Sequence, residues 1–251
     1  MKTKTTPETI KSQCETLKLR FIRDHYSQTI QQAAQNQWPP EEIIARLLEG
    51  EIHQKADRAL QNRIKNARFP FVKTLDDFDW SWPKKINRAQ IQHVFHLDWL
   101  PKCGNIFFIG GVGLGKSHLA AAMGYHACQQ GYSTKWVTAA DMINTLSAAQ
   151  RTGRLKSEIK TFLKPQLLII DELGYMPIDK NGADLVFQII SGRYESGAVC
   201  ITSNKIFKNW ASIFNNDANI TSAILDRLIH HGEPVLIEGK SYRLKNKIET
   251  N

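Results

Sequence analysis

One eight-residue segment constrains this chain more than any other feature. It reads Gly110-Gly111-Val112-Gly113-Leu114-Gly115-Lys116-Ser117 and matches the pattern G-x-x-x-x-G-K-[ST] in full. An apolar, strand-like stretch precedes it at residues 105–109, and a helix-like stretch follows at residues 118–130. A strand, a glycine-rich loop and a helix in this order form a cradle for phosphates. The chain is therefore expected to bind ATP together with Mg²⁺.

Each part of this segment has a predicted task. The glycines allow backbone N–H groups to turn towards the phosphates, and the start of the helix adds its positive dipole end. Lys116 is expected to reach the β- and γ-phosphates, and the Ser117 hydroxyl is expected to ligate Mg²⁺. The predicted nucleotide-binding residues extend one position further, to His118.

A second apolar run ends in two carboxylates. Residues 167–172 read Leu-Leu-Ile-Ile-Asp-Glu, which is typical of a buried strand with acids at its carboxyl end. Asp171 is predicted to hold Mg²⁺, and Glu172 is predicted to orient and deprotonate an attacking water. A carboxylate base suited to water favours hydrolysis over phosphate transfer to an acceptor.

Short apolar runs alternate with helical stretches through residues 84–251. The runs are residues 105–109, 134–137, 167–170, 199–202 and 235–237. This alternation predicts an α/β fold, with a parallel five-stranded sheet flanked by helices. Ligands bind at the carboxyl ends of such strands, so Asn204 is predicted to face the γ-phosphate or its water. An ordinary turn-forming asparagine is the alternative.

The first part of the chain has a different pattern. Residues 8–67 show helical spacing and no strand signal, and residues 69–83 form an aromatic-rich connector. We expect a small all-helical domain at residues 1–68, which binds DNA or a protein partner, and an ATPase domain at residues 69–251. The short stretch after residue 243 leaves no room for a C-terminal lid domain.

Composition limits the possible ligands and the cellular location of the protein. A net charge of +9 is typical of a polyanion binder, although a basic surface without a ligand is equally compatible with it. No apolar run reaches the roughly 20 residues of a membrane-spanning helix, and the N-terminus lacks the apolar core of a signal peptide, so a cytoplasmic protein is expected. The four cysteines are scattered, and the pair His93 and His96 has no matching ligands elsewhere in the sequence.

Taken in order, these motifs resemble the IstB family, the AAA+ ATPases that accompany the transposases of certain insertion sequences and are related to the helicase loader DnaC. The resemblance covers nearly the whole chain. It depends on the stretches at residues 113–120, 167–175, 202–204, 225–231 (Leu-Asp-Arg-Leu-Ile-His-His) and 239–245 (Gly-Lys-Ser-Tyr-Arg-Leu-Lys).

The resemblance implies that the protein binds double-stranded target DNA, assembles on it with ATP as a homo-oligomer, and delivers it to a transposase. It also implies ATP sites completed between subunits, with Arg227 as an arginine finger acting in trans and Arg243 as a second sensor near the nucleotide. From the residues alone, a surface pair of Arg227 with Asp226 is the favoured interpretation.

The DNA contacts are predicted less directly. Four basic residues fall where related initiator-type ATPases line their DNA path: Arg151, Arg154, Lys156 and Lys160. Solvated surface charges are the alternative. At the level of function, three other readings stay open: a helicase loader, a small-molecule kinase and a non-catalytic DNA-binding module.

Overall fold

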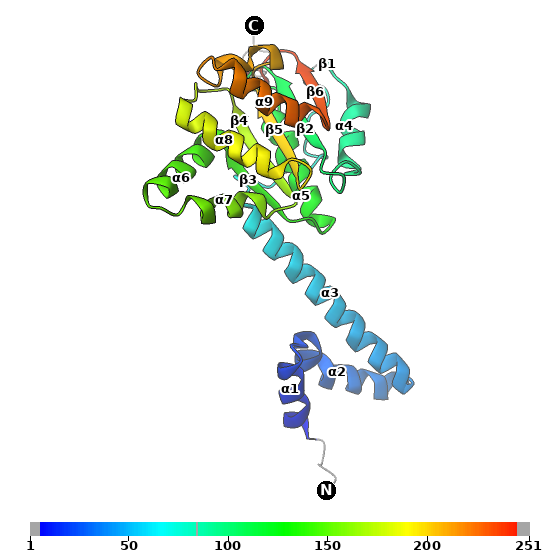
Figure 1. The fold of residues 1–251 in the computed structure, drawn as a ribbon. Coiled ribbons are helices and arrows are strands. Elements are labelled where there is room, and N and C mark those ends of the chain that lie inside the picture. Colours follow the sequence, from blue (N-terminus) through cyan, green and yellow to red (C-terminus); the bar gives the residue numbers. More distant parts are fainter. Residues whose placement is uncertain (1–5, 84, 245–251) are drawn as a thin grey trace. The chain divides into compact units, whose positions relative to one another are not determined.

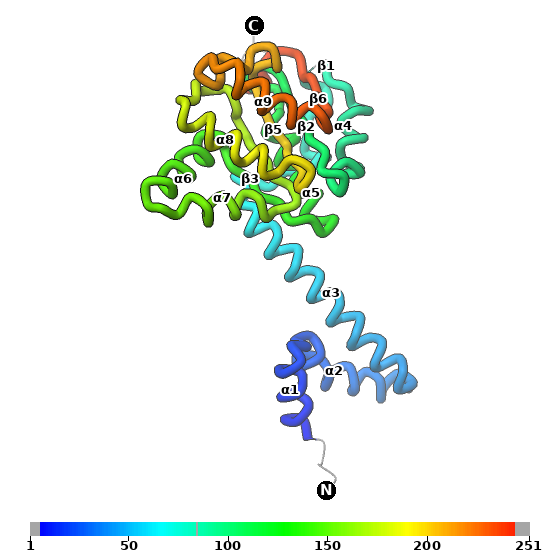
Figure 2. Tube along the Cα trace, in the orientation of Figure 1, coloured from blue at the N-terminus to red at the C-terminus, as the bar shows by residue number. Residues whose placement is uncertain are grey.

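A computed structural model describes residues 6–83 and 85–244, and the chain divides into two compact units, residues 1–62 and 63–251 (Figures 1 and 2). The first unit is helical. It contains α1 (Pro7–Thr16), α2 (Arg20–Asn36) and most of α3 (Pro40–Ala67), which continues into the second unit. α3 begins at Pro40 and has two acids, Glu41 and Glu42, in its first turn, which is typical of a helix start.

A buried carboxylate fixes α2 within the helical unit. Glu51 on α3 is 3% exposed, and its Oε2 accepts the backbone N–H groups of Phe21 and Ile22 at 2.8 and 3.3 Å. These N–H groups lie in the first turn of α2 and have no acceptor within that helix, so the carboxylate replaces a cap. Gly50 leaves room for the Phe21 ring beside α3.

The second unit is built on a six-stranded sheet in the order β1-β6-β2-β5-β4-β3 (Figure 1). The predicted five parallel strands are confirmed, and they are β2 (Asn105–Gly110), β3 (Thr134–Thr138), β4 (Leu167–Leu173), β5 (Ala198–Ser203) and β6 (Gly232–Glu238). The sequence did not reveal β1 (Lys85–Ile86), a short antiparallel strand on β6. Two residues are too few to give a periodic signal.

Helices cover both faces of this sheet. They are α4 (Arg88–Phe95), α5 (Lys116–Gln129), α6 (Ala139–Arg151), α7 (Leu155–Leu163), α8 (Lys180–Arg193) and α9 (Ala218–Ile229), with 3-10 turns η1 (Phe207–Ser212) and η2 (Tyr242–Leu244). Within the described residues, every helix is too short or too polar to cross a membrane.

Strand residues divide between two cores by alternation. Phe107 and Ile109 of β2 belong to the core under α6, α7, α8 and α9, whereas Ile106 and Phe108 belong to the core under α4 and α5. Successive side chains of a strand point to opposite faces, and both faces are covered here. The apolar runs are therefore continuous, which made these strands predictable.

Candidate nucleotide-binding site

The phosphate loop joins the end of β2 to the start of α5. Gly113 and Gly115 adopt left-handed φ values of +73° and +85°, which a residue with a side chain rarely adopts. Neighbouring groups also leave no space there: a Cβ at Gly113 would overlap the Ser241 hydroxyl, and one at Gly115 would lie 2.7 Å from the Phe78 ring. Both glycines are thus required by conformation and by packing.

Lys116 is held inside the loop. Lys116 is 4% exposed. Its Nζ donates to the Gly111 carbonyl at 2.7 Å and to the Tyr175 hydroxyl at 3.4 Å. Burial lowers the pKa of this ammonium, while the charge of Asp171 acts in the opposite direction and that of Arg243 lowers the pKa further. The Tyr175 contact was not predicted from the sequence.

A hydroxyl and a carboxylate meet beside the loop. Ser117 Oγ donates to Asp171 Oδ1 at 2.8 Å, and the same oxygen accepts a short hydrogen bond from Thr202 Oγ1. Asp171 is 6% exposed at the end of β4. Because β4 and β5 are parallel neighbours, their carboxyl ends bring Asp171 and Thr202 together. Thr202 lies in the Thr-Ser-Asn stretch, but its role could not be read from that motif.

Glu172 lies next to this cluster with its side chain exposed. Its φ is +63°, and its backbone N–H donates to Thr202 Oγ1 at 3.0 Å. The hydroxyl of Thr202 therefore fixes the carboxylate of Asp171 and the backbone of Glu172. Asn204 follows β5, and its Oδ1 is buried with no hydrogen-bond partner among the described residues. A buried polar atom without a partner is unusual and is compatible with a ligand contact.

Lys116, Ser117 and Glu172 line a cavity of about 450 Å³, whereas Asp171, Thr202 and Asn204 are not part of its lining. One wall is the phosphate loop with His118, Glu172 and Tyr175, and the opposite wall is the aromatic connector, which contributes Phe71, Lys73, Asp77, Phe78, Asp79 and Trp82. His118 is anchored to that wall, because Nε2 lies 3.2 Å from the Thr74 carbonyl, and burial lowers the pKa of its imidazole. The connector stood out in the sequence as aromatic-rich, but nothing in the sequence placed it here.

The segment after β6 closes the cavity from another side. Tyr242 and Arg243 line it, and the Tyr242 backbone N–H donates to the Gly113 carbonyl at 2.8 Å. Trp82 Nε1 donates to the Lys240 carbonyl at 2.8 Å. Arg243 therefore lies at the phosphate loop of its own chain. Lys245, the last residue of that motif, lies outside the described residues.

Arg227 lies at the other end of the sheet. The next residue, Leu228, accepts a hydrogen bond through its carbonyl from Asn105 Nδ2 at 2.9 Å, and Asn105 begins β2. The phosphate loop begins at Gly110, where β2 ends, and strands rise about 3.3 Å per residue, so the two ends are about 17 Å apart. The guanidinium of Arg227 donates to the Ala223 carbonyl at 2.8 Å and lies over the Phe187 ring. The structure does not bring Arg227 to the cavity of its own chain.

The basic residues predicted to contact DNA lie on α6, on α7 and in the turn between them. Arg151 ends α6, Arg154 precedes α7, and Lys156 and Lys160 are on α7 (Figure 1). All four are exposed. Lys156 and Lys160 are four residues apart and share one face of the helix.

A complete phosphate loop at the central strand of this sheet order, with acids at the end of β4, defines an ATP-binding protein of the AAA+ P-loop class. Residues 12–250 match the family of IstB-like ATP binding proteins, and the chain belongs to this family.

Named relatives come from insertion sequences. The chain is 38% identical over 240 residues to the IS5376 ATP-binding protein of Geobacillus stearothermophilus, covering 96% of this chain and 95% of that protein. It is 34% identical to the IS21 ATP-binding protein of Pseudomonas aeruginosa, covering 92% and 87%. The match to the family that the sequence resembled is thus confirmed.

Solved structures agree on the fold. The DnaC helicase loader superposes with a TM-score of 0.55 at 24% identity over 66% of this chain and 96% of that one. DnaA from Aquifex aeolicus, bound to AMPPCP, gives 0.55 at 22% identity over 70% and 55%. At these identities the likeness concerns the fold.

Proposed function

We propose that this protein is an Mg²⁺-dependent ATPase that assembles on double-stranded target DNA and delivers it to the transposase of its insertion sequence. The observation that carries the chemistry is the cluster of Lys116, Ser117, Asp171 and Glu172 at one end of the sheet. The observation that carries the setting is the family, since its named relatives are ATP-binding proteins of insertion sequences.

Nucleotide binding begins with the loop and Lys116. Backbone N–H groups of the glycine-rich turn and the first turn of α5 face the phosphates, where the helix dipole favours negative charge. The ammonium of Lys116 leaves its carbonyl and phenol partners and donates to the β- and γ-phosphates. Arg243 adds a cation from the same chain.

The residues beside the loop fit Mg²⁺. Magnesium prefers hard oxygen ligands, and the Ser117 hydroxyl and the Asp171 carboxylate already lie 2.8 Å apart. When bound, Mg²⁺ would neutralise phosphate charge and polarise the γ-phosphoryl group. Thr202 would keep Asp171 oriented through its own hydrogen bond.

Hydrolysis needs a base and a positioned water. The exposed carboxylate of Glu172 would act as the base that accepts a proton from water. The Glu172 backbone N–H is held by the Thr202 hydroxyl. Asn204 has a free acceptor atom with which to orient that water or the γ-phosphate. A small-molecule kinase would use an acceptor pocket in place of this water-activating carboxylate.

Arg227 would complete the site from a neighbouring copy. About 17 Å separate the amino end of β2 from the phosphate loop, more than an arginine side chain spans. An arginine that stabilises the transferring phosphoryl group can be supplied in trans. The homo-oligomer then couples assembly to hydrolysis, because a lone protomer lacks this cation.

DNA would lie against the exposed basic residues of α6 and α7, whose contacts would go to phosphates. Replacing Lys156 and Lys160 by alanine should reduce the salt dependence of DNA binding by about one unit of slope per lysine. An unchanged slope would move the DNA to another surface. Glu158 on the same helix offers a control, since its replacement by Gln should not lower affinity.

A helicase loader is the second candidate, since DnaC shares the fold. The decisive experiment measures ATP-dependent assembly on duplex DNA and capture of an IstA-like transposase, compared with capture of a replicative helicase. Wild-type protein should bring the transposase to DNA with ATP, and Lys116→Ala should not. Capture of the helicase alone would support the loader.

A further inference from the structure

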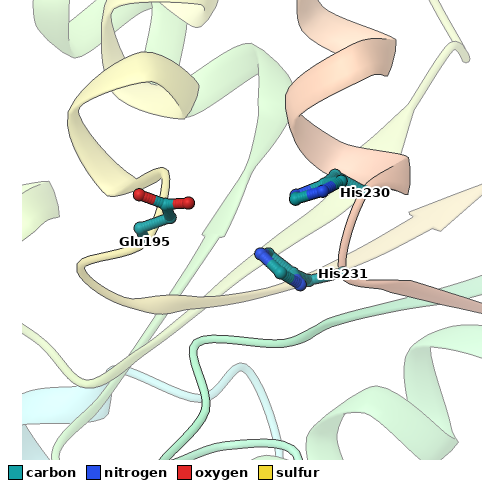
Figure 3. Close-up of side chains that lie close together, drawn as sticks. All are labelled: Glu195, His230 and His231. Carbon is teal, nitrogen blue, oxygen red and sulfur yellow. The ribbon is translucent and has the colours of Figure 1, made fainter.

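We propose that Glu195, His230 and His231 form a binding site for a transition-metal ion, with Zn²⁺ as the expected occupant (Figure 3). This site is separate from the nucleotide cavity and does not depend on the proposed function. Among the described residues, this is the one group of three or more His, Cys, Asp or Glu side chains close enough to share an ion.

The three ligands come from two turns. Glu195 lies in the turn between α8 and β5, whereas His230 and His231 lie between α9 and β6. Their ligand atoms are within 4.8 Å of one another, and Figure 3 shows the carboxylate and both rings around a common space. Zn²⁺ bonds of about 2.0–2.1 Å in tetrahedral geometry place ligand atoms about 3.4 Å apart. Closing the remaining gap of at most about 1.4 Å needs small rotations of exposed side chains.

Neighbouring contacts prepare the imidazoles. The Tyr194 hydroxyl lies 3.2 Å from His230 Nδ1, and its ring stacks against the His231 ring at 26°. A hydrogen bond at one ring nitrogen fixes the tautomer and leaves the other nitrogen free for a metal. When Nδ1 of His230 donates to the Tyr194 hydroxyl oxygen, Nε2 carries no proton and can bind the ion.

The donor set selects the class of ion. Two imidazoles and one carboxylate suit Zn²⁺ and its first-row neighbours, whereas Mg²⁺ and Ca²⁺ prefer oxygen ligands only. Three protein ligands leave a fourth position for water. Two cations, Arg193 and Arg227, line the adjoining small cavity and oppose binding. The guanidinium of Arg227 is engaged by the Ala223 carbonyl and the Phe187 ring, and that of Arg193 donates to backbone carbonyls.

An ion here would join the last turn of α9 to the turn after α8. Glu195, His231 and Arg227 line the same small cavity, so the ion would fix the helix end that carries Arg227. The expected consequence is reduced motion of the end of α9 that carries Arg227, without any contact between the ion and the nucleotide.

The test uses the full chain, stripped of metal with a chelator. Titration with Zn²⁺ alone should show one ion per chain, and Co²⁺ should give the visible absorption of a four-coordinate site. His231→Ala, His230→Ala and Glu195→Gln should each weaken Zn²⁺ binding about 10-fold or more. Zn²⁺ should also raise the melting temperature of the wild type and leave that of His231→Ala unchanged.

The chain provides a matched control in His93 and His96, whose ring centres are 6.5 Å apart and which belong to no group of three possible ligands among the described residues. Replacing both by alanine should leave the stoichiometry and affinity intact. If His231→Ala binds Zn²⁺ as the wild type does, or if the control variant loses the ion, the site is wrong and any binding is an adventitious ion only. ATP binding by His231→Ala provides the check that the variant is folded.

Discussion

The two ends of the parallel sheet use polar side chains in opposite ways. At the amino end, Arg193 is 1% exposed and its terminal nitrogens donate to the carbonyls of Phe162, Leu163, Pro165, Gln166 and Ala198. Asn105 there bonds Val199 N–H and the Leu228 carbonyl. At the carboxyl end, Asp171 bonds two hydroxyls, and the Asn204 acceptor has no partner among the described residues.

This difference separates stability from chemistry. Polar groups that satisfy backbone carbonyls replace missing secondary structure and hold the fold together. Polar groups that lie close to one another in a site lower the stability of the folded protein, and a bound ligand can restore it. Substitutions at the amino end should therefore lower the free energy of unfolding, whereas those at the carboxyl end should inactivate a folded protein. Arg227 is the exception, since it lies at the amino end but is proposed to serve chemistry.

The largest effect is expected for Arg227→Ala. Hydrolysis at saturating DNA should fall about 1,000-fold, because the phosphoryl group loses a cation supplied in trans. ATP binding should persist, since Arg227 lies outside the cavity of its own chain. Steady-state phosphate release and fluorescent-nucleotide binding measure the two quantities, with Asp226→Asn as the neighbouring control.

Mixing variants sharpens the same test. Arg227→Ala keeps an intact nucleotide cavity, and Glu172→Gln keeps an intact Arg227, so a mixture should recover hydrolysis that neither variant shows alone. No recovery at any ratio would contradict an arginine that acts between subunits.

Glu172→Gln is expected to reduce hydrolysis about 100-fold, because a general base is removed. The amide preserves size, so the fold and ATP binding should be unchanged. ATP-bound protein should remain longer on DNA, measured as dissociation from a labelled duplex. Equal residence of variant and wild type would favour a DNA-binding module that does not use hydrolysis as a switch.

Arg193→Met tests the opposite end. Loss of the carbonyl partners should lower the free energy of unfolding by about 2 kcal/mol, roughly a 30-fold shift in the folding equilibrium. Burial already lowers the pKa of this guanidinium to about 10. Urea unfolding measures the change, and hydrolysis per folded molecule should stay near wild type. A strong catalytic defect in folded protein would break the division between the two ends.

Tyr175→Phe should have the smallest effect. The hydroxyl oxygen accepts one hydrogen bond from Lys116 Nζ, and burial raises the pKa of this phenol, so it is protonated at neutral pH. Removing it should change ATP affinity only a few-fold, because one weak hydrogen bond contributes about 1 kcal/mol. Tyr132→Phe, outside the cavity lining, is the control. A change in hydrolysis alone would assign the hydroxyl to the reaction and not to binding.

The sequence predicted what depends on local pattern. Five strands, the phosphate loop and the two acids at the end of β4 could be recognised. β2 and most of β4 are buried and therefore continuous in apolar residues. The roles of those residues remain predictions that the variants above test.

Long-range partners could not be predicted. Tyr175 reaches Lys116 across 59 positions, and Thr202 reaches Asp171 across 31. The connector at residues 71–82 also lines the nucleotide cavity only because the phosphate loop, later in the chain, folds against it. These contacts depend on how elements meet in space, which hydrophobic spacing does not encode. The same holds for Arg227, whose distance from the loop follows from the length of β2.

The hydrogen bond from Trp82 to the Lys240 carbonyl joins residues 158 positions apart, next to the loop that Tyr242 also contacts. Within residues 63–244, hydrogen bonds therefore join the connector to residues 240–242, and residues 240–242 to the phosphate loop. A displacement of Gly113 on nucleotide entry would be transmitted along both backbones at once, outward through residues 240–243 and back through the connector towards α3. Nucleotide binding at the loop would then change the backbone positions of the segments connected to it.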